Sequence, residues 1–197
     1  MFSCWGFRAI ASEKSFIAAS FLFKALMFFD KYSQCNWVAT RTESWEFKLL
    51  NISIKGQNRG AKRSQAIFFC VDAKFFPYAL FVADQVVKKY FQLDFDICLF
   101  SCEELPSHPL IDDHNIRVLQ VDADNWNENV PVNDSISFAS YLRILIPFLM
   151  RDEYSRMLYL DADVFYRKGD LNRLLKLDLL GRPIGAVRDL CQLRHPN

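Results

Sequence analysis

Two aspartates with clear chemical meaning stand in the triplet Asp161-Ala162-Asp163, which follows the apolar run Met157 to Leu160. If the chain stays extended there, side chains two residues apart point to the same side, so both carboxylates can share one hard cation. Carboxylate oxygens suit Mg²⁺ or Mn²⁺, and such an ion can neutralise a departing nucleotide diphosphate. The triplet therefore predicts a divalent-metal site that serves transfer from a diphosphate-activated donor.

The same spacing occurs a second time, in Asp122-Ala123-Asp124, again after an apolar run. Aspartates that follow a strand also cap turns, so the pattern alone leaves a purely structural role open. Asp124 leads into the turn-like stretch Asn125 to Asn127, whereas Asp163 leads into another apolar run. This difference favours the Asp161 triplet modestly, but spacing does not decide between the two.

A different enzyme class also fits the residues around Asp161. Four apolar residues followed by D-x-D-x-[TV] form the nucleophile motif of haloacid-dehalogenase-type phosphatases, and Met157 to Val164 satisfies it. Asp161 would then be the phosphorylated nucleophile and Asp163 the general acid/base. That motif opens its domain, whereas about four expected strands precede it here. The placement therefore argues against a phosphatase.

Arg143 is the only charged side chain in the run Phe138 to Met150. An unpaired buried charge is very unfavourable, so this guanidinium needs a partner. It can pair with an acidic residue of the core, or it can bind the phosphates or the sugar of a donor, and the sequence leaves both roles open. The three histidines, His108, His114 and His195, are expected to be exposed in loops, and their spacing places none of them as a metal ligand.

Composition indicates a globular protein, with 51% hydrophobic and 24% charged residues. The 24 basic and 23 acidic side chains nearly cancel, so we expect no nucleic-acid partner. The six cysteines include no C-x-x-C pair, which argues against a zinc site or a disulfide framework. The run Phe16 to Phe29 is interrupted by Lys24 and is shorter than the roughly 20 residues of a spanning helix, so no transmembrane helix is expected.

Strand-like and helix-like runs alternate from Ala66 onward, which predicts an α/β fold with a mostly parallel sheet flanked by helices. Strands are expected at Ala66 to Val71, Phe95 to Phe100, Ile116 to Val121, Met157 to Leu160 and Pro183 to Val187. Helices are expected from Pro77 to Tyr90, from Phe138 to Leu145 with caps from Ser135 and Ser137 and an end or kink at Pro147, and from Leu171 to Leu177. Ligands bind beyond the carboxyl ends of such strands, where Asp72, Asp161 and Asp189 fall.

Residues 1–64 show no sustained helical or strand period. They end in the polar stretch Lys55 to Ser64, which contains Gly56 and Gly60 and predicts a linker. We therefore divide the chain into an N-terminal segment of doubtful structure, residues 1–64, and one domain over residues 65–197.

Four motifs between Ser137 and Asp189 resemble glycosyltransferase family 8: S-F-A-S-Y-L-R-I-L-I-P, M-L-Y-L-D-A-D-V, G-D-L-N-R-L and P-I-G-A-V-R-D. The segment Phe68 to Tyr78 resembles the family's first strand and nucleotide-binding turn. The resemblance covers about residues 65–197. It implies a GT-A fold, a UDP-sugar donor, Mn²⁺ or Mg²⁺, and transfer of a hexose with retention of configuration to a glycan acceptor of the lipopolysaccharide type.

The resemblance also implies roles for individual residues. Asp161 and Asp163 would be the metal ligands, which settles the contest with Asp122 and Asp124, and Ala162 would lie in the nucleotide-sugar site between them. Asp72 would accept from the uracil edge, and Phe75 would stack on the base where the family often has a tyrosine. Arg143 would reach the donor and Asp189 would lie near the sugar, both as catalytic residues.

The chain departs from the family pattern at its end. Members usually supply a third metal ligand, a histidine, and their acceptor-binding residues from a later motif, and His195 comes too early to be that ligand. We therefore expect an incomplete copy, with an inactive nucleotide-sugar-binding remnant as the alternative to an active transferase. We expect a cytoplasmic protein, compatible with peripheral contact at the inner membrane, or a protein of the Golgi lumen if the chain is eukaryotic.

Overall fold

The structure, a computed structural model, describes residues 27–30, 52–123, 137–182 and 184–186. The strands are β1 Met27–Asp30, β2 Ser53–Gln57, β3 Gln65–Cys70, β4 Asp96–Ser101, β5 Arg117–Asp122, β6 Arg156–Tyr159 and β7 Ile184–Ala186. The helices are α2 Phe76–Val87, α3 Pro109–Asp113, α5 Ala139–Leu149 and α6 Leu171–Leu175.

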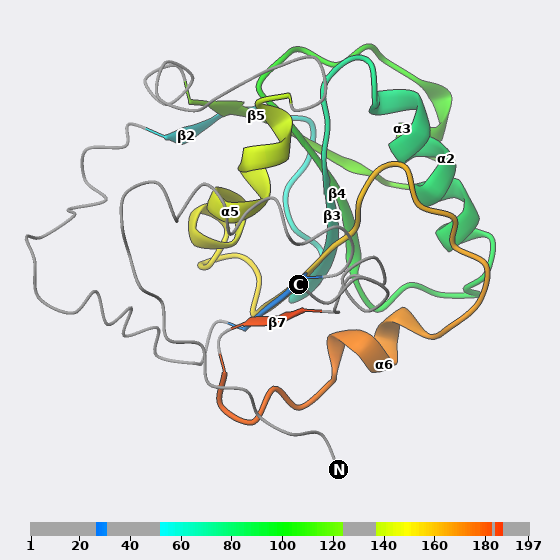
Figure 1. Ribbon diagram of the computed structural model, residues 1–197. Coiled ribbons are helices and arrows are strands. Elements are labelled where there is room, and N and C mark those ends of the chain that lie inside the picture. Colours follow the sequence, from blue (N-terminus) through cyan, green and yellow to red (C-terminus); the bar gives the residue numbers. More distant parts are fainter. Residues whose placement is uncertain (1–26, 31–51, 124–136, 183, 187–197) are drawn as a thin grey trace, which may run out of the picture.

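The described strands form one seven-stranded sheet in the order β2-β5-β4-β3-β6-β1-β7 (Figure 1). The four neighbours β5, β4, β3 and β6 are parallel to one another. β2 joins β5 in the antiparallel sense, and β1 lies antiparallel between β6 and β7. The predicted mostly parallel α/β fold is therefore confirmed.

The sheet separates two hydrophobic cores, and β3 contributes to both. Ile67 and Phe69 belong to the core beneath α2, α3 and α6, whereas Phe68 and Cys70 belong to the core beneath α5. Alternate residues of a strand point to opposite faces, so a strand buried on both faces needs an uninterrupted apolar run. Helices cover both faces in Figure 1, which is why the run Ala66 to Cys70 contains no charged residue.

The expected helices are present, with one correction to α5. Pro147 was expected to end or kink this helix, yet α5 continues through it to Leu149. The proline stands in the last turn, where Met150 N donates to Ile146 O at 2.9 Å and closes the helix. No side chain caps the start of α5: Ser137 contributes its carbonyl, which accepts from Ser140 N at 3.0 Å, and Ser135 lies outside the described residues.

The prediction of a linker over Lys55 to Ser64 is wrong. β2 pairs with β5 from Ser53 opposite Asp122 to Gln57 opposite Leu119, with a register shift between Ile54 and Gly56. Asn58 continues this pairing, because its side chain donates to Ile116 O at 3.1 Å and accepts from Val118 N at 2.9 Å. Residues 52–64 thus belong to the edge of the same sheet. For residues 1–51, the division into a separate N-terminal segment stays a prediction.

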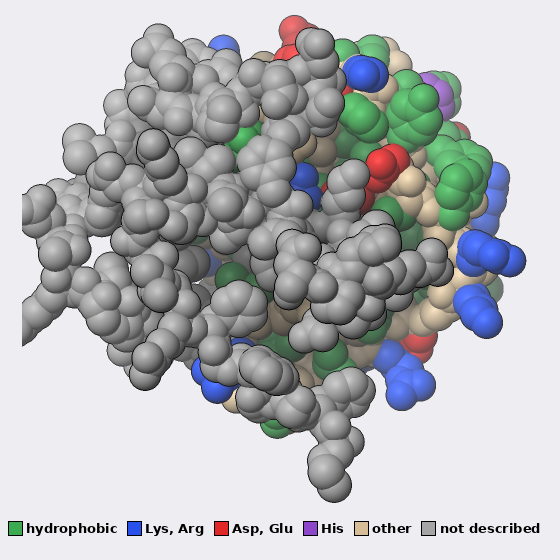
Figure 2. Space-filling model, viewed as in Figure 1, with side chains coloured by type: hydrophobic (Ala, Val, Ile, Leu, Met, Phe, Trp, Pro, Cys, Tyr) green, Lys and Arg blue, Asp and Glu red, His purple; other side chains and the backbone are tan. Residues whose placement is uncertain are grey.

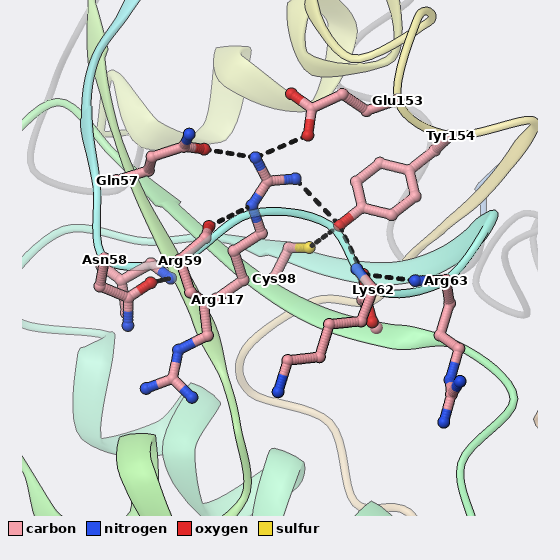
Figure 3. Close-up of polar contacts among 11 residues, drawn as sticks. Gln57, Asn58, Arg59, Lys62, Arg63, Cys98, Arg117, Glu153 and Tyr154 are labelled. Atoms are coloured by element: carbon pink, nitrogen blue, oxygen red, sulfur yellow. Dashed lines mark hydrogen bonds and ion pairs between the residues drawn. The ribbon is translucent and has the colours of Figure 1, made fainter.

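Arg117 holds this segment from inside the protein (Figure 3). Its side chain is 2% exposed, donates from Nε to Arg59 O at 2.9 Å, and pairs with Glu153 Oε2 at 2.7 Å. The same guanidinium also donates to Gln57 Oε1 and, at 3.0 Å, to the hydroxyl of Tyr154. A buried charge is tolerated only when its donors are satisfied, so this arginine requires residues 57–59 to be in place.

Tyr154 extends the same network to the next strand. Its hydroxyl donates to Asp96 Oδ2 at 3.0 Å, and that oxygen also accepts from the backbone N–H groups of Lys62 and Arg63 at 2.8 and 3.2 Å (Figure 3). The Cys98 thiol lies 3.4 Å from the same hydroxyl. These contacts gather at the amino ends of β4 and β5, so they fix the edge of the sheet that lies opposite Asp72 and Asp161.

Among the described residues, Cys70, Cys98 and Cys102 form no disulfide, while Cys4, Cys35 and Cys191 lie outside them. The same portion of the chain contains no helix long and apolar enough to cross a membrane. His108 is exposed as expected. His114 is a correction, because it is half-buried and its Nε2 lies 2.9 Å from Asp84 Oδ1 on α2. His195 lies outside the described residues.

Candidate functional site

Asp72 and Asp161 follow two adjacent parallel strands at the same edge of the sheet. β3 and β6 are paired in register from Gln65 opposite Arg156 to Phe68 opposite Tyr159. Leu160 N donates to Phe68 O at 3.0 Å, which holds the end of β6 against β3. Because the two strands are parallel and hydrogen-bonded to their ends, the segments that leave them begin side by side.

Asp161 is bound by two neighbours. Its Oδ1 accepts from the hydroxyl of Tyr159 at 2.6 Å and from Nη1 of Arg143 at 3.3 Å. The side chains of Arg143 and Asp161 are each 15% exposed, and the guanidinium carbon of Arg143 lies 4.8 Å from the centre of the Tyr159 ring. The sequence left open whether Arg143 pairs with a core acid or serves a ligand, and its acidic partner is Asp161 of the candidate metal triplet.

Asp163 lies differently from the expectation of an extended triplet. β6 ends at Tyr159, and the chain turns at Ala162 and Asp163. Ala162 is buried and packs in the core beneath α2, so its methyl group is directed inward. Asp161 is left half-buried beside Arg143, whereas Asp163 is exposed. The period-two argument therefore does not describe this triplet, because the burial of Ala162 bends the chain there.

Asp72 closes the turn that leads into α2. Its Oδ1 accepts from Phe75 N at 2.9 Å, and its carbonyl accepts from Phe76 N at 3.0 Å. Ala73 N in the same turn donates to Glu103 Oε2 at 3.0 Å, so the loop after β4 also braces it. Asp72 thus has the structural role of fixing the turn between β3 and α2. Its predicted contact with a uracil edge stays a prediction.

Phe75 stands in this turn as a half-buried ring. Its centre lies 5.9 Å from the ring of Tyr78, and Lys74 Nζ lies 5.5 Å above it. A ring held by neighbours on one side and still partly open to solvent is suited to stacking on a planar base. Stacking of this ring on the uracil base stays a prediction.

Two buried groups beside Asp161 remain protonated. Burial raises the pKa of Tyr159 well above its usual value, so the phenol stays a hydrogen-bond donor to Asp161. Burial likewise raises the pKa of the Cys70 thiol far above its usual value, even though Arg143 acts to lower it. Cys70 is therefore not a thiolate nucleophile at neutral pH.

The donor set at this edge fits a divalent cation in its chemistry. Mg²⁺ and similar ions are commonly held by one or two carboxylates, with water and substrate phosphates completing the shell. Asp161 and Asp163 would be the two carboxylates, and their role as metal ligands stays a prediction. Within the residues that the structure describes, no group of three or more His, Cys, Asp or Glu side chains could hold a metal ion. Donor phosphates and water would therefore have to complete the coordination.

Three further acids were considered in the sequence. Asp122, from the competing triplet, is the half-buried last residue of β5, opposite Ser53 of β2. Asp124 and Asp189 lie outside the described residues.

Sequence reasoning missed Tyr159 and Glu103. The signal for Tyr159 was its place within an apolar strand two residues before Asp161, because a buried tyrosine hydroxyl needs a partner and the nearest acid is on the same strand face. Glu103 has no comparable signal. It reaches the turn after β3 only because β4 lies beside β3 in the sheet.

The model of the family "Glycosyl transferase family 8" matches residues 66–196. The chain belongs to glycosyltransferase family 8. General stress protein A of Bacillus subtilis (strain 168) is similar to it, with 37% identity over 78 residues. That alignment covers 39% of this chain and 27% of the relative, so the chain spans about a quarter of the curated protein that it matches. No solved structure matches the chain.

Membership of family 8 agrees with the architecture, because the family implies a GT-A fold and the sheet is mostly parallel with helices on both faces. The matched range includes Asp72, which follows β3, and the contacting pair Arg143 and Asp161 beyond the end of β6. Family 8 is a family of glycosyltransferases and not of haloacid-dehalogenase-type phosphatases. The phosphatase interpretation of the Asp161 triplet is therefore not supported.

Proposed function

We propose that the chain binds a UDP-sugar together with Mn²⁺ or Mg²⁺ and contributes to the transfer of its hexose to a glycan acceptor with retention of configuration. The observation that carries this proposal is the contact between Arg143 and Asp161 at the carboxyl edge of the sheet. A cation and an acid held together beside an exposed second acid offer complementary charges to a metal-bound diphosphate. Membership of family 8 supports the reaction class.

Asp161 and Asp163 would hold the divalent ion in this proposal. When bound, the ion would neutralise charge on the leaving UDP. Tyr159 would keep Asp161 in one orientation, because its hydroxyl and Arg143 bind the same carboxylate oxygen. Asp163, which is exposed, would turn toward the donor without having to leave a buried contact.

Arg143 would have two tasks at the donor site. Its Nε is anchored on Ser140 O at 2.6 Å, which fixes the base of the guanidinium on the first turn of α5. Its Nη1 contacts Asp161, and the guanidinium would share its charge with an oxygen of the diphosphate. Phe75 and Asp72 would receive the uracil base at the turn between β3 and α2.

Binding of the nucleotide sugar without transfer is the second candidate function. The observation that favours it is the absence, within the described residues, of any third side-chain ligand near the two carboxylates. Two carboxylates with phosphates can suffice to bind a cation, whereas transfer also needs an acceptor held in line with the donor.

Transfer and binding without transfer can be distinguished with a UDP-hexose whose sugar is radioactively labelled. The full chain would be incubated with Mn²⁺ and a panel of UDP-hexoses, and free UDP and free hexose would be measured over time. Slow release of UDP with the hexose passed to water is expected, because water can take the place of a missing acceptor at the activated donor. Tight binding of a UDP-hexose with no release would favour the binding protein, and release of phosphate from p-nitrophenyl phosphate would instead contradict the proposal.

A further inference from the structure

A surface beside the candidate site combines exposed aromatic rings with cations. We call it the aromatic-basic patch, and it comprises Phe81, Lys88, Lys89, Phe165, Arg167 and Lys168. It is formed where the chain after the Asp161 triplet runs along α2. Three successive contacts fix this arrangement: the ring of Phe165 meets that of Phe81, Tyr166 N donates to Gln85 Oε1 at 3.2 Å, and Lys89 Nζ donates to Arg167 O.

The two aromatic rings of the patch contact each other although both face solvent. Phe81 is 49% exposed and Phe165 is 72% exposed, and their ring centres lie 5.9 Å apart at 80°. Beneath them the segment is anchored by Tyr166, whose hydroxyl lies 3.1 Å from that of Tyr90 and donates to Gly169 O at 2.8 Å. Two exposed phenyl rings fixed in contact with each other indicate a surface that binds a partner, because a core role would bury them.

Cations line the same face. Lys88, Lys89, Arg167 and Lys168 are all exposed, and Figure 2 shows Lys and Arg side chains in a row along the rim beside α2 and the chain that leads to α6. The acid on this part of α2, Asp84, is only 15% exposed and is engaged by Lys88 and His114. Asp170 is engaged in capping α6. Lys88 is paired with Asp84, so Lys89, Arg167 and Lys168 supply the positive charge beside the two phenyl rings, next to the exposed acids Asp163 and Asp170.

We propose that the aromatic-basic patch binds the surface of an anionic lipid bilayer. Phenyl rings insert into the boundary between headgroups and acyl chains, while lysine and arginine on the same face attract anionic headgroups. Each cation near such a surface adds to the attraction. Charge complementarity selects this occupant. A second copy of the chain would bring the same cations against each other, and a neutral sugar would leave them unused.

This orientation has a consequence for the candidate site. Phe165 is separated from the metal-binding candidate Asp163 only by Val164, so a bilayer seated on the patch would lie next to the acidic triplet. An acceptor carried on a lipid would then be delivered at the edge of the sheet. This last consequence rests on the proposed function, whereas lipid binding does not.

Co-sedimentation with vesicles tests the patch, with the full chain and without nucleotide or metal. We expect binding to phosphatidylcholine vesicles that contain 30% phosphatidylglycerol, about tenfold weaker binding to phosphatidylcholine alone, and about tenfold weaker binding when NaCl is raised from 0.1 to 0.5 M. The double variants Phe81→Ser/Phe165→Ser and Arg167→Glu/Lys168→Glu should each lower the partition coefficient at least about tenfold.

Phe148 and Arg151 provide a matched control, because Phe148 is also 49% exposed and the Arg151 guanidinium lies 4.6 Å over its ring. Phe148→Ser/Arg151→Glu should bind vesicles like the wild type.

Thermal melting would verify folding, and the single variant Phe165→Ser, at the more exposed ring, keeps the test valid if a double variant unfolds. Equal binding by wild type and patch variants would overturn the proposal. So would a dimer, detected by sedimentation velocity, that the Phe81→Ser/Phe165→Ser change abolishes. UDP binding measured without lipid is independent of these outcomes.

Discussion

The hydroxyl of Tyr159 donates a 2.6 Å hydrogen bond to Oδ1 of Asp161, the acid two residues beyond the end of β6. The tyrosine is buried, so the bond is shielded from water and fixes the rotamer of an acid that is itself half-buried. Asp161 is therefore oriented before any ligand arrives. Such a fixed orientation is expected if Tyr159 orients a metal ligand through a hydrogen bond.

Removal of this hydroxyl should weaken metal-dependent binding more than it weakens the fold. In Tyr159→Phe we expect the affinity for Mn²⁺ in the presence of UDP to fall at least about tenfold, because groups that orient metal ligands typically have effects of this size. Tyr154→Phe is the matched control, since Tyr154 is equally buried but lies at the opposite edge of the sheet. Equal loss of Mn²⁺ affinity in the two variants would contradict the orienting role.

Phe75 should contribute to nucleotide affinity through its ring. We expect Phe75→Ala to weaken UDP binding about tenfold, in line with about 1–3 kcal/mol for stacking of a base on an aromatic side chain. Binding of pyrophosphate, which has no base, should be unchanged, and Phe75→Tyr should retain UDP binding. Titration calorimetry with both ligands measures the difference. A parallel loss of pyrophosphate binding would mean that the turn itself had been disturbed.

Arg117 should be among the residues on which folding depends most. Removal of one partner of a buried ionic network typically costs about 3–5 kcal/mol, and we expect Arg117→Met to lower the free energy of unfolding by about 3 kcal/mol. Urea denaturation followed by fluorescence measures the change. Arg167→Met, at an exposed site, should change it by less than about 0.5 kcal/mol. A cost below about 1 kcal/mol for Arg117→Met would mean that residues 57–59 do not depend on this side chain.

The buried tyrosines predict an alkaline limit to stability. Burial raises the pKa of both Tyr154 and Tyr159 above the usual value near 10, so the native state keeps protons that the unfolded chain has lost. Stability is therefore constant with respect to these groups below about pH 10 and falls above it, by up to about 1.4 kcal/mol per pH unit for each tyrosine. Tyr154→Phe should flatten this decline between pH 10 and 11. An unchanged slope would show that the phenol titrates normally in the folded protein.

The strands at the centre of the sheet were predictable because they are buried on both faces. Such strands require continuous apolar runs, and the predicted and observed bounds of β3, β4, β5 and β6 differ by one residue at each end. The carboxyl edge followed from the parallel order, and so did the positions of Asp72 and Asp161. These features depend on local composition, which a single sequence contains.

The edge of the sheet was not predictable in the same way. β2 is short, contains Gly56 and exposes alternate residues, so its only signal was the pair of half-buried isoleucines Ile52 and Ile54. The sequence signal for Arg117 was clearer. Arg117 lies two and four residues before the buried Leu119 and Val121 of β5, so its side chain had to face inward with theirs. Its partners come from residues 57–59 and 153–154, and no local pattern links these segments.

The turn at Ala162 shows why the geometry of the acidic triplet could not be predicted from spacing. Period two holds only while the chain remains a strand, and β6 stops at Tyr159. The small side chain of Ala162 is what lets the chain pack into the core at this point. Asp161 and Asp163 therefore differ in exposure and in neighbours, and they need not contribute equally to a metal site.

Calorimetric titration of UDP into the full chain, with Mn²⁺ and with EDTA, tests the central claim most directly. Asp163 is exposed, so Asp163→Ala should leave the free energy of unfolding unchanged. It should weaken Mn²⁺-dependent UDP binding at least about tenfold, whereas Asp122→Asn, in the competing triplet, should bind like the wild type. UDP binding that is unaffected by Asp163→Ala and by EDTA would contradict the assignment of the Asp161-Ala162-Asp163 triplet as the metal-dependent nucleotide-sugar site.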